Sequence, residues 1–317
     1  MIKHRRQPPE TSQLCTLSVH ERVARRQRSG PLWQDAAMPA DEPQVRSTPI
    51  RGGRIETFTL PGGGPGVPLV VLGGVETALR PLAGTENVLL RRWSGRTARR
   101  GVTVVGRPLA DDAAETERLT HPRVIADAVA AAVRGLSGPV AVEAESGGGR
   151  ISLWLTVDHP ELVSRLVLAS VASETPPNSP MTERMAQWID LAEKGAWAEF
   201  FARMAVQMKP AGSAPADAFA VAAGFQPKPA TPERFIGELK ATLDPSSFVT
   251  DRLGEVSVPT LVLAGGQDQV VPPEGSRLVA ERIPGARFEE DPESGHTVRS
   301  SFRGYDQLVE AFLAEGD

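Results

Sequence analysis

A serine among small residues is the strongest candidate for chemistry in this 317-residue chain. Ser146 follows a short apolar run at 139–143 and precedes a helix-type run at 151–157. A serine at such a strand-to-helix junction is typical of a nucleophile elbow, where glycines leave room for a sharp turn. The usual spacing is G-x-S-x-G; here Ala144 replaces the first glycine and Gly148 keeps the second.

A base must accompany this serine, because its hydroxyl is a poor nucleophile until a neighbour removes its proton. Histidine is the usual base, since its pKa lies near neutrality. Of the five histidines, only His296 lies just beyond a late predicted strand. His159 is at the far end of the helix after Ser146, about 20 Å away at 1.5 Å per residue. Elimination therefore favours His296.

An acid is expected at the end of another strand, to orient the histidine ring and stabilise its protonated form. Asp268 directly follows the apolar run at 259–264. Glu174, after the preceding strand, is the alternative acid. Each of these residues alone could be an ordinary turn or loop residue, but their joint placement at strand ends favours a Ser146, His296 and Asp268 triad.

An oxyanion hole would need two backbone N–H groups aimed at the charge that develops on the substrate oxygen. Gly147, after the candidate nucleophile, is expected to supply one. Val75, in the loop after the apolar run at 68–72, is expected to supply the other. A plain glycine turn at 73–74, with no part in an oxyanion hole, is equally compatible with this sequence.

These residues sit within an alternation of strand-type and helix-type segments. Such alternation predicts an α/β fold with a mostly parallel central sheet flanked by helices. The predicted strands are 54–60, 68–72, 102–105, 139–143, 165–169, 259–264 and 286–289. The main predicted helices are 87–100, 123–136, the segment after Ser146, 232–242, 273–283 and 305–314.

The alternation divides the chain into regions. Residues 176–250 contain no convincing strand, so we expect a helical cap inserted between core segments 49–175 and 251–317. Methionines and aromatic residues at helical spacing in this insertion either pack it onto the core or line an apolar pocket. Residues 1–48 are polar and arginine-rich; we expect a disordered extension, or sequence upstream of a true start at Met38.

Composition narrows the partners. The net charge of −4 argues against a general nucleic-acid binder, and no apolar run approaches the ~20 residues of a membrane span. The single cysteine, Cys15, excludes an internal disulfide, and the N-terminal stretch lacks the apolar segment of a secretory signal. We expect a cytoplasmic protein with a small-molecule substrate, no metal or organic cofactor, and no nucleic-acid or membrane partner. The oligomeric state is left open.

Three segments carry a resemblance to a known family: HPELVSRLVLAS, VPTLVLAGGQDQVVPP and SGH. Through them the chain resembles, over about residues 50–315, the α/β-hydrolase superfamily, in particular its small capped esterase, peptidase and perhydrolase branch. The resemblance implies an α/β-hydrolase fold with Ser146, Asp268 and His296 as the triad, found in this chain order.

The sequence departs from the family pattern at three places. The usual His-Gly after the oxyanion strand is Gly73 and Gly74, and the usual Asp-Arg-Gly pattern after the next strand falls at 106–109, which reads Gly-Arg-Pro-Leu. Ala144 at the elbow is the third departure. The first two affect the geometry of the loops and the contacts with substrate rather than the triad.

The sequence thus predicts a serine hydrolase that cleaves an ester or related acyl bond of a small, apolar substrate through an acyl-enzyme. One alternative is a non-catalytic ligand-binding protein of the same fold. Others use the same triad for C–C hydrolysis, perhydrolysis or acyl transfer.

Overall fold

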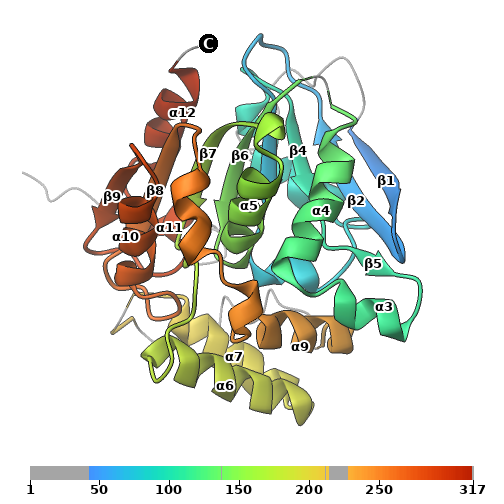
Figure 1. The fold of residues 1–317 in the computed structure, drawn as a ribbon, viewed down its shortest axis with the longest axis vertical. Helices are drawn as coiled ribbons and strands as arrows, with labels where there is room; N and C mark the ends of the chain where they lie inside the picture. The colour runs from blue at the N-terminus through green and yellow to red at the C-terminus, as the bar shows by residue number, and fades with distance from the viewer. Residues whose placement is uncertain (1–42, 137, 211, 214–227, 316–317) are drawn as a thin grey trace, which may run out of the picture. The chain divides into compact units, whose positions relative to one another are not determined.

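The computed structural model describes residues 43–136, 138–210, 212–213 and 228–315. A mostly parallel sheet forms the centre of the fold. Its strands are β1 Gln44–Ile50, β2 Gly53–Leu60, β3 Leu69–Leu72, β4 Val102–Val105, β5 Leu109–Ala110, β6 Val140–Glu145, β7 Val163–Ala169, β8 Thr260–Gly265 and β9 Arg287–Asp291. The order is β1-β2-β4-β3-β6-β7-β8-β9, with β5 paired to β2 (Figure 1). Neighbours from β4 to β9 are parallel, whereas β2 runs antiparallel to β1, β4 and β5.

Helices cover both faces of this sheet. The α-helices are α2 Glu86–Trp93, α3 Ala113–Arg118, α4 Pro122–Val133, α5 Gly147–Asp158, α6 Pro180–Glu193, α7 Trp197–Gln207, α9 Pro232–Ala241, α10 Pro273–Arg282, α11 Val298–Ser301 and α12 Tyr305–Ala314. The 3-10 turns are η1 Val75–Ala78, η2 Ser94–Arg96, η3 Pro160–Leu162, η4 Pro245–Ser247 and η5 Thr250–Glu255. Apolar side chains of α4, α5 and α10 pack on one face, and those of α2 and α12 on the other.

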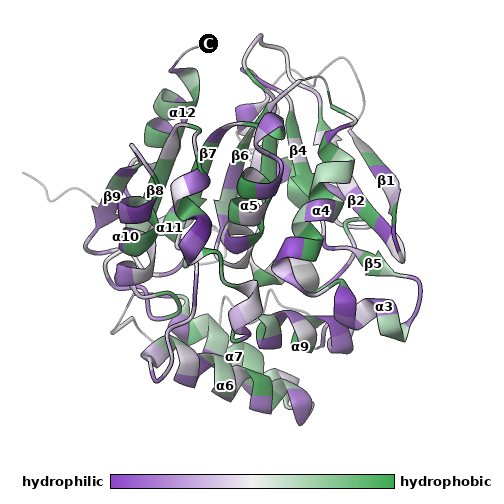
Figure 2. Cartoon of the chain, viewed as in Figure 1, coloured by the Kyte–Doolittle hydropathy of each residue, from purple (hydrophilic) through white to green (hydrophobic). Residues whose placement is uncertain are grey.

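The buried strands explain why period-two alternation is weak in the sequence. In β3, Val70 and Leu72 enter the core with α4 and α5, whereas Leu69 and Val71 enter the core with α2 and α12. A parallel strand covered on both faces is apolar throughout. Figure 2 shows the resulting hydrophobic colour along the central strands, with hydrophilic residues on the helices around them.

The predicted elements agree best with the observed ones where the apolar pattern of the sequence is strongest. The predicted strand at 102–105 and the predicted helix at 305–314 have the same bounds as β4 and α12. The predicted helix at 87–100 is wrong beyond α2, which ends at Trp93 before a serine and a glycine and gives way to η2. Ser and Gly both weaken a helix interior.

The core boundary expected at residue 49 falls inside strand β1. β1 begins at Gln44 and pairs with β2 at the edge of the sheet. An edge strand needs few apolar residues and tolerates proline, here Pro49, so its sequence gives little signal. The expectations for residues 1–42, the possible start at Met38 included, lie outside the described residues.

Between β7 and β8 the chain leaves the sheet. We call residues 176–250 the insertion; its described part contains α6, α7, α9 and no strand. Figure 1 shows these helices grouped beyond one end of the central strands. Edge-to-face ring contacts tie the helices together, with Phe200 at the centre of Trp188, Trp197, Phe201 and Phe235 at centroid distances of 5.8, 5.9, 5.1 and 5.4 Å.

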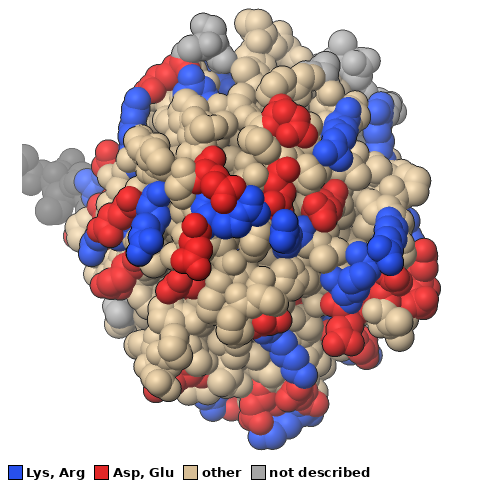
Figure 3. Space-filling model, in the orientation of Figure 1, with Lys and Arg blue, Asp and Glu red and all other residues tan. Residues whose placement is uncertain are grey.

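The described surface gives no single-sign patch on the face in Figure 3, where Lys and Arg side chains alternate with Asp and Glu. None of the described helices combines the length and apolar character that a membrane crossing requires. The cytoplasmic location expected from composition stays a prediction.

Candidate active site

Ser146 occupies a strained turn between β6 and α5. Its φ of 52° and ψ of −123° are rare for a residue with a side chain. Two backbone hydrogen bonds hold it there: its N–H donates to Ala169 O at 2.9 Å, and its carbonyl accepts from Gly149 N at 2.9 Å. The strand-to-helix turn is therefore as sharp as the sequence predicts.

Gly148 is the residue that this turn requires to be glycine. A Cβ added there would lie 2.2 Å from the Leu72 carbonyl oxygen and 2.5 Å from that of Gly73. Ala144, by contrast, has its methyl group in the apolar core and is 1% exposed. The missing first glycine of the motif is therefore accommodated by core packing, whereas the second cannot be replaced without moving the loop after β3.

We expect Gly148→Ala to lower the free energy of unfolding by about 2–3 kcal/mol, because overpacking against fixed backbone forces the loop to shift. Gly147→Ala is the matched control, since the nearest atoms to a Cβ there are 3.8 Å away. Denaturant unfolding of the two variants measures the difference. Equal stability would contradict the tight approach at Gly148.

His296 and Asp268 converge on Ser146 from the loops after β9 and β8. The His296 Nε2 atom lies 2.9 Å from Ser146 Oγ, and its Nδ1 atom lies 2.8 Å from Asp268 Oδ2. His296 is 3% exposed and Asp268 6%. The other carboxylate oxygen, Oδ1, accepts the N–H groups of Val270 and Val271 at 2.8 and 2.9 Å, which fixes the direction of Oδ2.

The structure thus brings together the three residues proposed as a triad. The alternative acid, Glu174, lines a different cavity beside Pro176 and Pro272. Its carboxylate acts electrostatically on Arg150. Asp268 is the carboxylate in hydrogen-bond contact with the ring.

The two residues expected to form an oxyanion hole are also neighbours. Val75 is the first residue of η1 and Gly147 the first of α5. The N–H groups at the start of a helix have no acceptor within it. A Cβ built on Gly147 would lie 3.8 Å from Val75 N, so both amides border the space beside Ser146.

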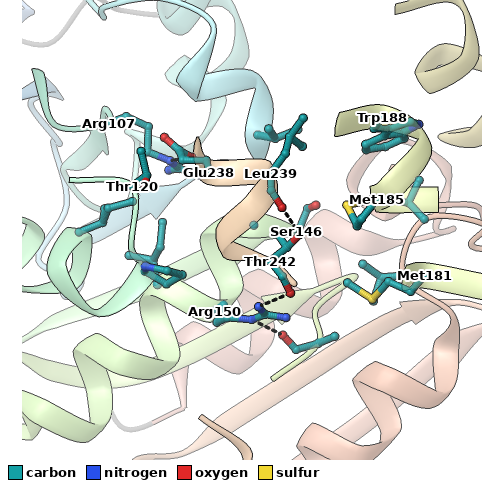
Figure 4. Close-up of a pocket in the computed structure, with 18 residues that line it drawn as sticks. Arg107, Thr120, Ser146, Arg150, Met181, Met185, Trp188, Glu238, Leu239 and Thr242 are labelled. Atoms are coloured by element: carbon teal, nitrogen blue, oxygen red, sulfur yellow. Dashed lines mark hydrogen bonds and ion pairs between the residues drawn. The ribbon is translucent and has the colours of Figure 1, made fainter. Parts of the chain in front are cut away.

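Two cavities meet at this serine, and both are walled partly by the insertion. The small cavity has a volume of about 80 Å³; the large cavity has about 450 Å³. Ser146, Val75, Trp188 and Val270 line both. Gly147 lines the small cavity, and His296 lines the large one. In Figure 4 Ser146 lies between the side chains of Met181, Met185 and Trp188 on one side and of Arg107, Thr120 and Glu238 on the other.

The methionines of α6 serve both roles that the sequence left open. Met181 and Met185 are buried in the apolar cluster of the insertion and also line the small cavity. Packing and pocket lining are therefore properties of the same side chains.

Three charged residues of the small cavity were not predicted as functional: Arg107, Arg150 and Glu238. Arg150, in α5, donates to Thr242 O at 3.1 Å (Figure 4). It also donates to Ser247 Oγ at 3.0 Å, and the two bonds tie the helix after Ser146 to the end of the insertion. Burial lowers the pKa of Arg150 to about 10, so it stays charged at neutral pH. In the sequence, Arg150 is the one charged residue between Ser146 and Asp158.

Within the described ranges, no group of three or more His, Cys, Asp or Glu side chains is placed to hold a metal ion.

Solved structures share this architecture. MGS-M2, an alpha/beta hydrolase enzyme from a Medee basin deep-sea metagenome library, is 14% identical, with a TM-score of 0.68 over 86% of this chain and 98% of that one. The esterase EaEST from Exiguobacterium antarcticum is 20% identical, with a TM-score of 0.65 over 86% and 100%. A thermophilic esterase from Thermogutta terrifontis is 18% identical, with a TM-score of 0.63 over 87% and 99%. At these identities the likeness is one of fold.

Sequence comparison supplies the family. No curated protein sequence matches the chain. The model of the family described as serine aminopeptidase, S33, matches residues 123–299, which is more than half of the chain and contains the segments with Ser146, Asp268 and His296. The sheet order, the turn at Ser146 and this match agree, and the chain belongs to the serine aminopeptidase S33 family of the α/β-hydrolase superfamily.

Proposed function

We propose that the protein is a serine hydrolase that cleaves an ester of a small, apolar acid. The observation that carries the proposal is the hydrogen-bonded line from Ser146 through His296 to Asp268, with distances of 2.9 and 2.8 Å, beside two cavities. A nucleophile, a base within reach and an acid that orients the base are the parts acyl transfer needs.

In the first half of the reaction, His296 Nε2 accepts the proton of Ser146 as Oγ attacks the ester carbonyl. The carbonyl oxygen becomes an oxyanion and accepts the N–H groups of Val75 and Gly147. When the tetrahedral intermediate collapses, the C–O bond to the alcohol breaks and His296 returns its proton to the leaving oxygen. The acyl group is then esterified to Ser146.

In the second half, water attacks the acyl-enzyme while His296 accepts one of its protons. Collapse of the second tetrahedral intermediate breaks the bond to Ser146 Oγ, which regains its proton from His296. Asp268 stays ionised throughout and balances the charge of the protonated ring.

The two cavities suggest how an ester is oriented. His296 lines the large cavity, and the leaving oxygen must lie within reach of its proton. We therefore assign the alcohol to the large cavity and the acyl group to the small one, whose walls include Met181, Met185 and Leu239. The small volume of about 80 Å³ favours short acyl groups.

The insertion acts in this proposal as a cap. Trp188 lines both cavities, and Met204 and Met208 add to the wall of the large one. Closing apolar side chains over the site excludes water from the charges that form during reaction, which strengthens the hydrogen bonds to the oxyanion.

The main rival is a non-catalytic binding protein that keeps the fold. A binder is under no constraint to hold Ser146, His296 and Asp268 in hydrogen-bond contact, and it has no use for a strained serine. The short contacts and the φ of 52° at Ser146 therefore favour an enzyme.

Labelling with a fluorophosphonate tests the proposal directly. We expect one covalent adduct per chain, located by peptide mapping on Ser146, because its oxygen displaces fluoride only when a base activates it. Heat-denatured protein and the Ser146→Ala variant are the controls and should carry no label. An unlabelled native protein, or a label on another residue, would favour the binding protein.

A further inference from the structure

Arg107, in the loop after β4, forms hydrogen bonds with the loop after β3 and with α9. Its Nη2 atom donates to the carbonyl oxygens of Gly73 and Gly74 at 3.2 and 3.1 Å. Its Nε atom donates to Glu238 Oε2 at 2.9 Å. The side chain of Arg107 is 1% exposed and that of Glu238 is 8% exposed, so the ion pair is buried. Figure 4 shows the two side chains directed toward each other at the wall of the small cavity.

The contact with Gly74 determines where the next amide points. The carbonyl of Gly74 and the N–H of Val75 belong to one planar peptide unit, and no cis peptide bond occurs in the described chain. In a trans peptide the two groups point in opposite directions, so holding the oxygen aims the N–H. Thr77 also holds the Gly74 carbonyl oxygen, because its N–H and its hydroxyl donate to it at 3.1 and 2.8 Å.

The hydrogen bonds to these carbonyl oxygens matter because the loop contains two glycines. Gly73 and Gly74 have no side chains to restrict rotation of the peptide units around them. Without anchors on the carbonyl oxygens, the Val75 N–H would be free to turn away from the substrate. Preorganised donors are effective because they need no reorientation during the reaction.

Glu238 connects this anchor to the insertion. It lies in α9, which approaches the core so closely that a Cβ on the adjacent Gly237 would meet Thr120 Cγ2 at 2.7 Å. The same helix is tied to the loop after β4 by Arg234, whose Nη1 donates to Pro108 O at 3.0 Å. A buried guanidinium also needs a counter-charge, and Glu238 supplies it for Arg107.

We propose that Glu238 and Arg107 are positioning residues that make the Val75 oxyanion donor depend on the docked insertion. The inference rests on the proposed function, because it assumes that Val75 N–H binds the oxyanion. Glu238 holds Arg107, Arg107 holds the Gly73 and Gly74 carbonyls, and these aim the Val75 amide. The catalytic power of the core therefore requires α9 in place.

The test compares Glu238→Leu with Glu238→Gln in hydrolysis of p-nitrophenyl butyrate. Leucine keeps the volume but removes the acceptor, and we expect kcat to fall about 10- to 30-fold with KM within twofold, less than the 10²–10³ expected for loss of one oxyanion donor. Glutamine removes the counter-charge but still accepts from Arg107 Nε and so still holds the guanidinium in place, and kcat should stay within about threefold. Glu233→Leu, at an exposed position of the same helix, is the matched control and should match the wild type.

A double-mutant cycle separates positioning from general loosening. Val75→Pro removes the N–H at the first residue of η1, a position where proline is accepted. In that background Glu238→Leu should change kcat less than about threefold. An unchanged kcat in Glu238→Leu alone, or an undiminished further loss in the Val75→Pro background, would overturn the relay. Equal rates for wild type and Ser146→Ala would overturn the proposed function and the relay with it.

Discussion

Replacing Ser146 by alanine is expected to lower kcat for p-nitrophenyl butyrate by a factor on the order of 10⁶, the loss typical of removing the nucleophile of a triad. The reason is that alanine has no oxygen to attack the ester carbonyl in the place of Ser146 Oγ, which lies 2.9 Å from His296 Nε2. The residual rate would come from substrate binding and the oxyanion donors. Steady-state kinetics with highly purified protein, checked by unfolding curves, measures the effect.

Ser170 offers a matched control for this variant. It follows β7 with the same φ of 52°, and its side chain is buried. Its hydroxyl has no hydrogen-bond partner among the described residues, so Ser170→Ala should be neutral or mildly stabilising and should keep full activity. Comparable losses in both variants would show that the Ser146 effect is structural.

Asp268→Asn should lower kcat by about 10⁴-fold. One side-chain oxygen must accept the Val270 and Val271 N–H groups, so asparagine would place its carbonyl there and turn its NH₂ toward His296 Nδ1. The ring would then have to accept at Nδ1 and carry its proton on Nε2, where it could no longer accept the proton of Ser146. The measurement is kcat at neutral pH on protein with wild-type unfolding behaviour.

Glu174→Gln is the companion variant and should retain most activity, since Glu174 lines a separate cavity. If instead Asp268→Asn were active and Glu174→Gln inactive, the assignment of the acid would be wrong.

The proximity of the three proposed triad residues could be predicted because parallel strands end at one edge of a sheet. Ser146 and Asp268 follow the buried strands β6 and β8, and His296 follows the more polar strand β9, so the order of the strands places the three residues near one another. Strand β1 was not predicted because it lies at the edge of the sheet and pairs with β2 alone. The residues of an edge strand need not be apolar, so the sequence carries little signal for it.

The support of the oxyanion loop could not be predicted from local pattern. Arg107 and Glu238 are 131 positions apart, and nothing in the spacing of either segment indicates the other. From the sequence, Gly73-Gly74 and the segment 106–109 that contains Arg107 were separate departures from the family pattern. In the fold they contact each other, so the two departures form one hydrogen-bonded unit.

The large cavity has a consequence for which compound accepts the acyl group. In the proposed mechanism, its volume of about 450 Å³ is vacated when the alcohol leaves, and the next nucleophile approaches the acyl-enzyme from the side of His296. Arg92, Glu145 and Thr297 on its walls are polar, and Arg92 Nη2 and Glu145 Oε2 form an ion pair at 3.3 Å. A nucleophile held there competes with water through its local concentration rather than its bulk concentration. Under the proposed mechanism, the ratio of acyl transfer to hydrolysis would depend on this cavity, whereas the triad would be common to both reactions.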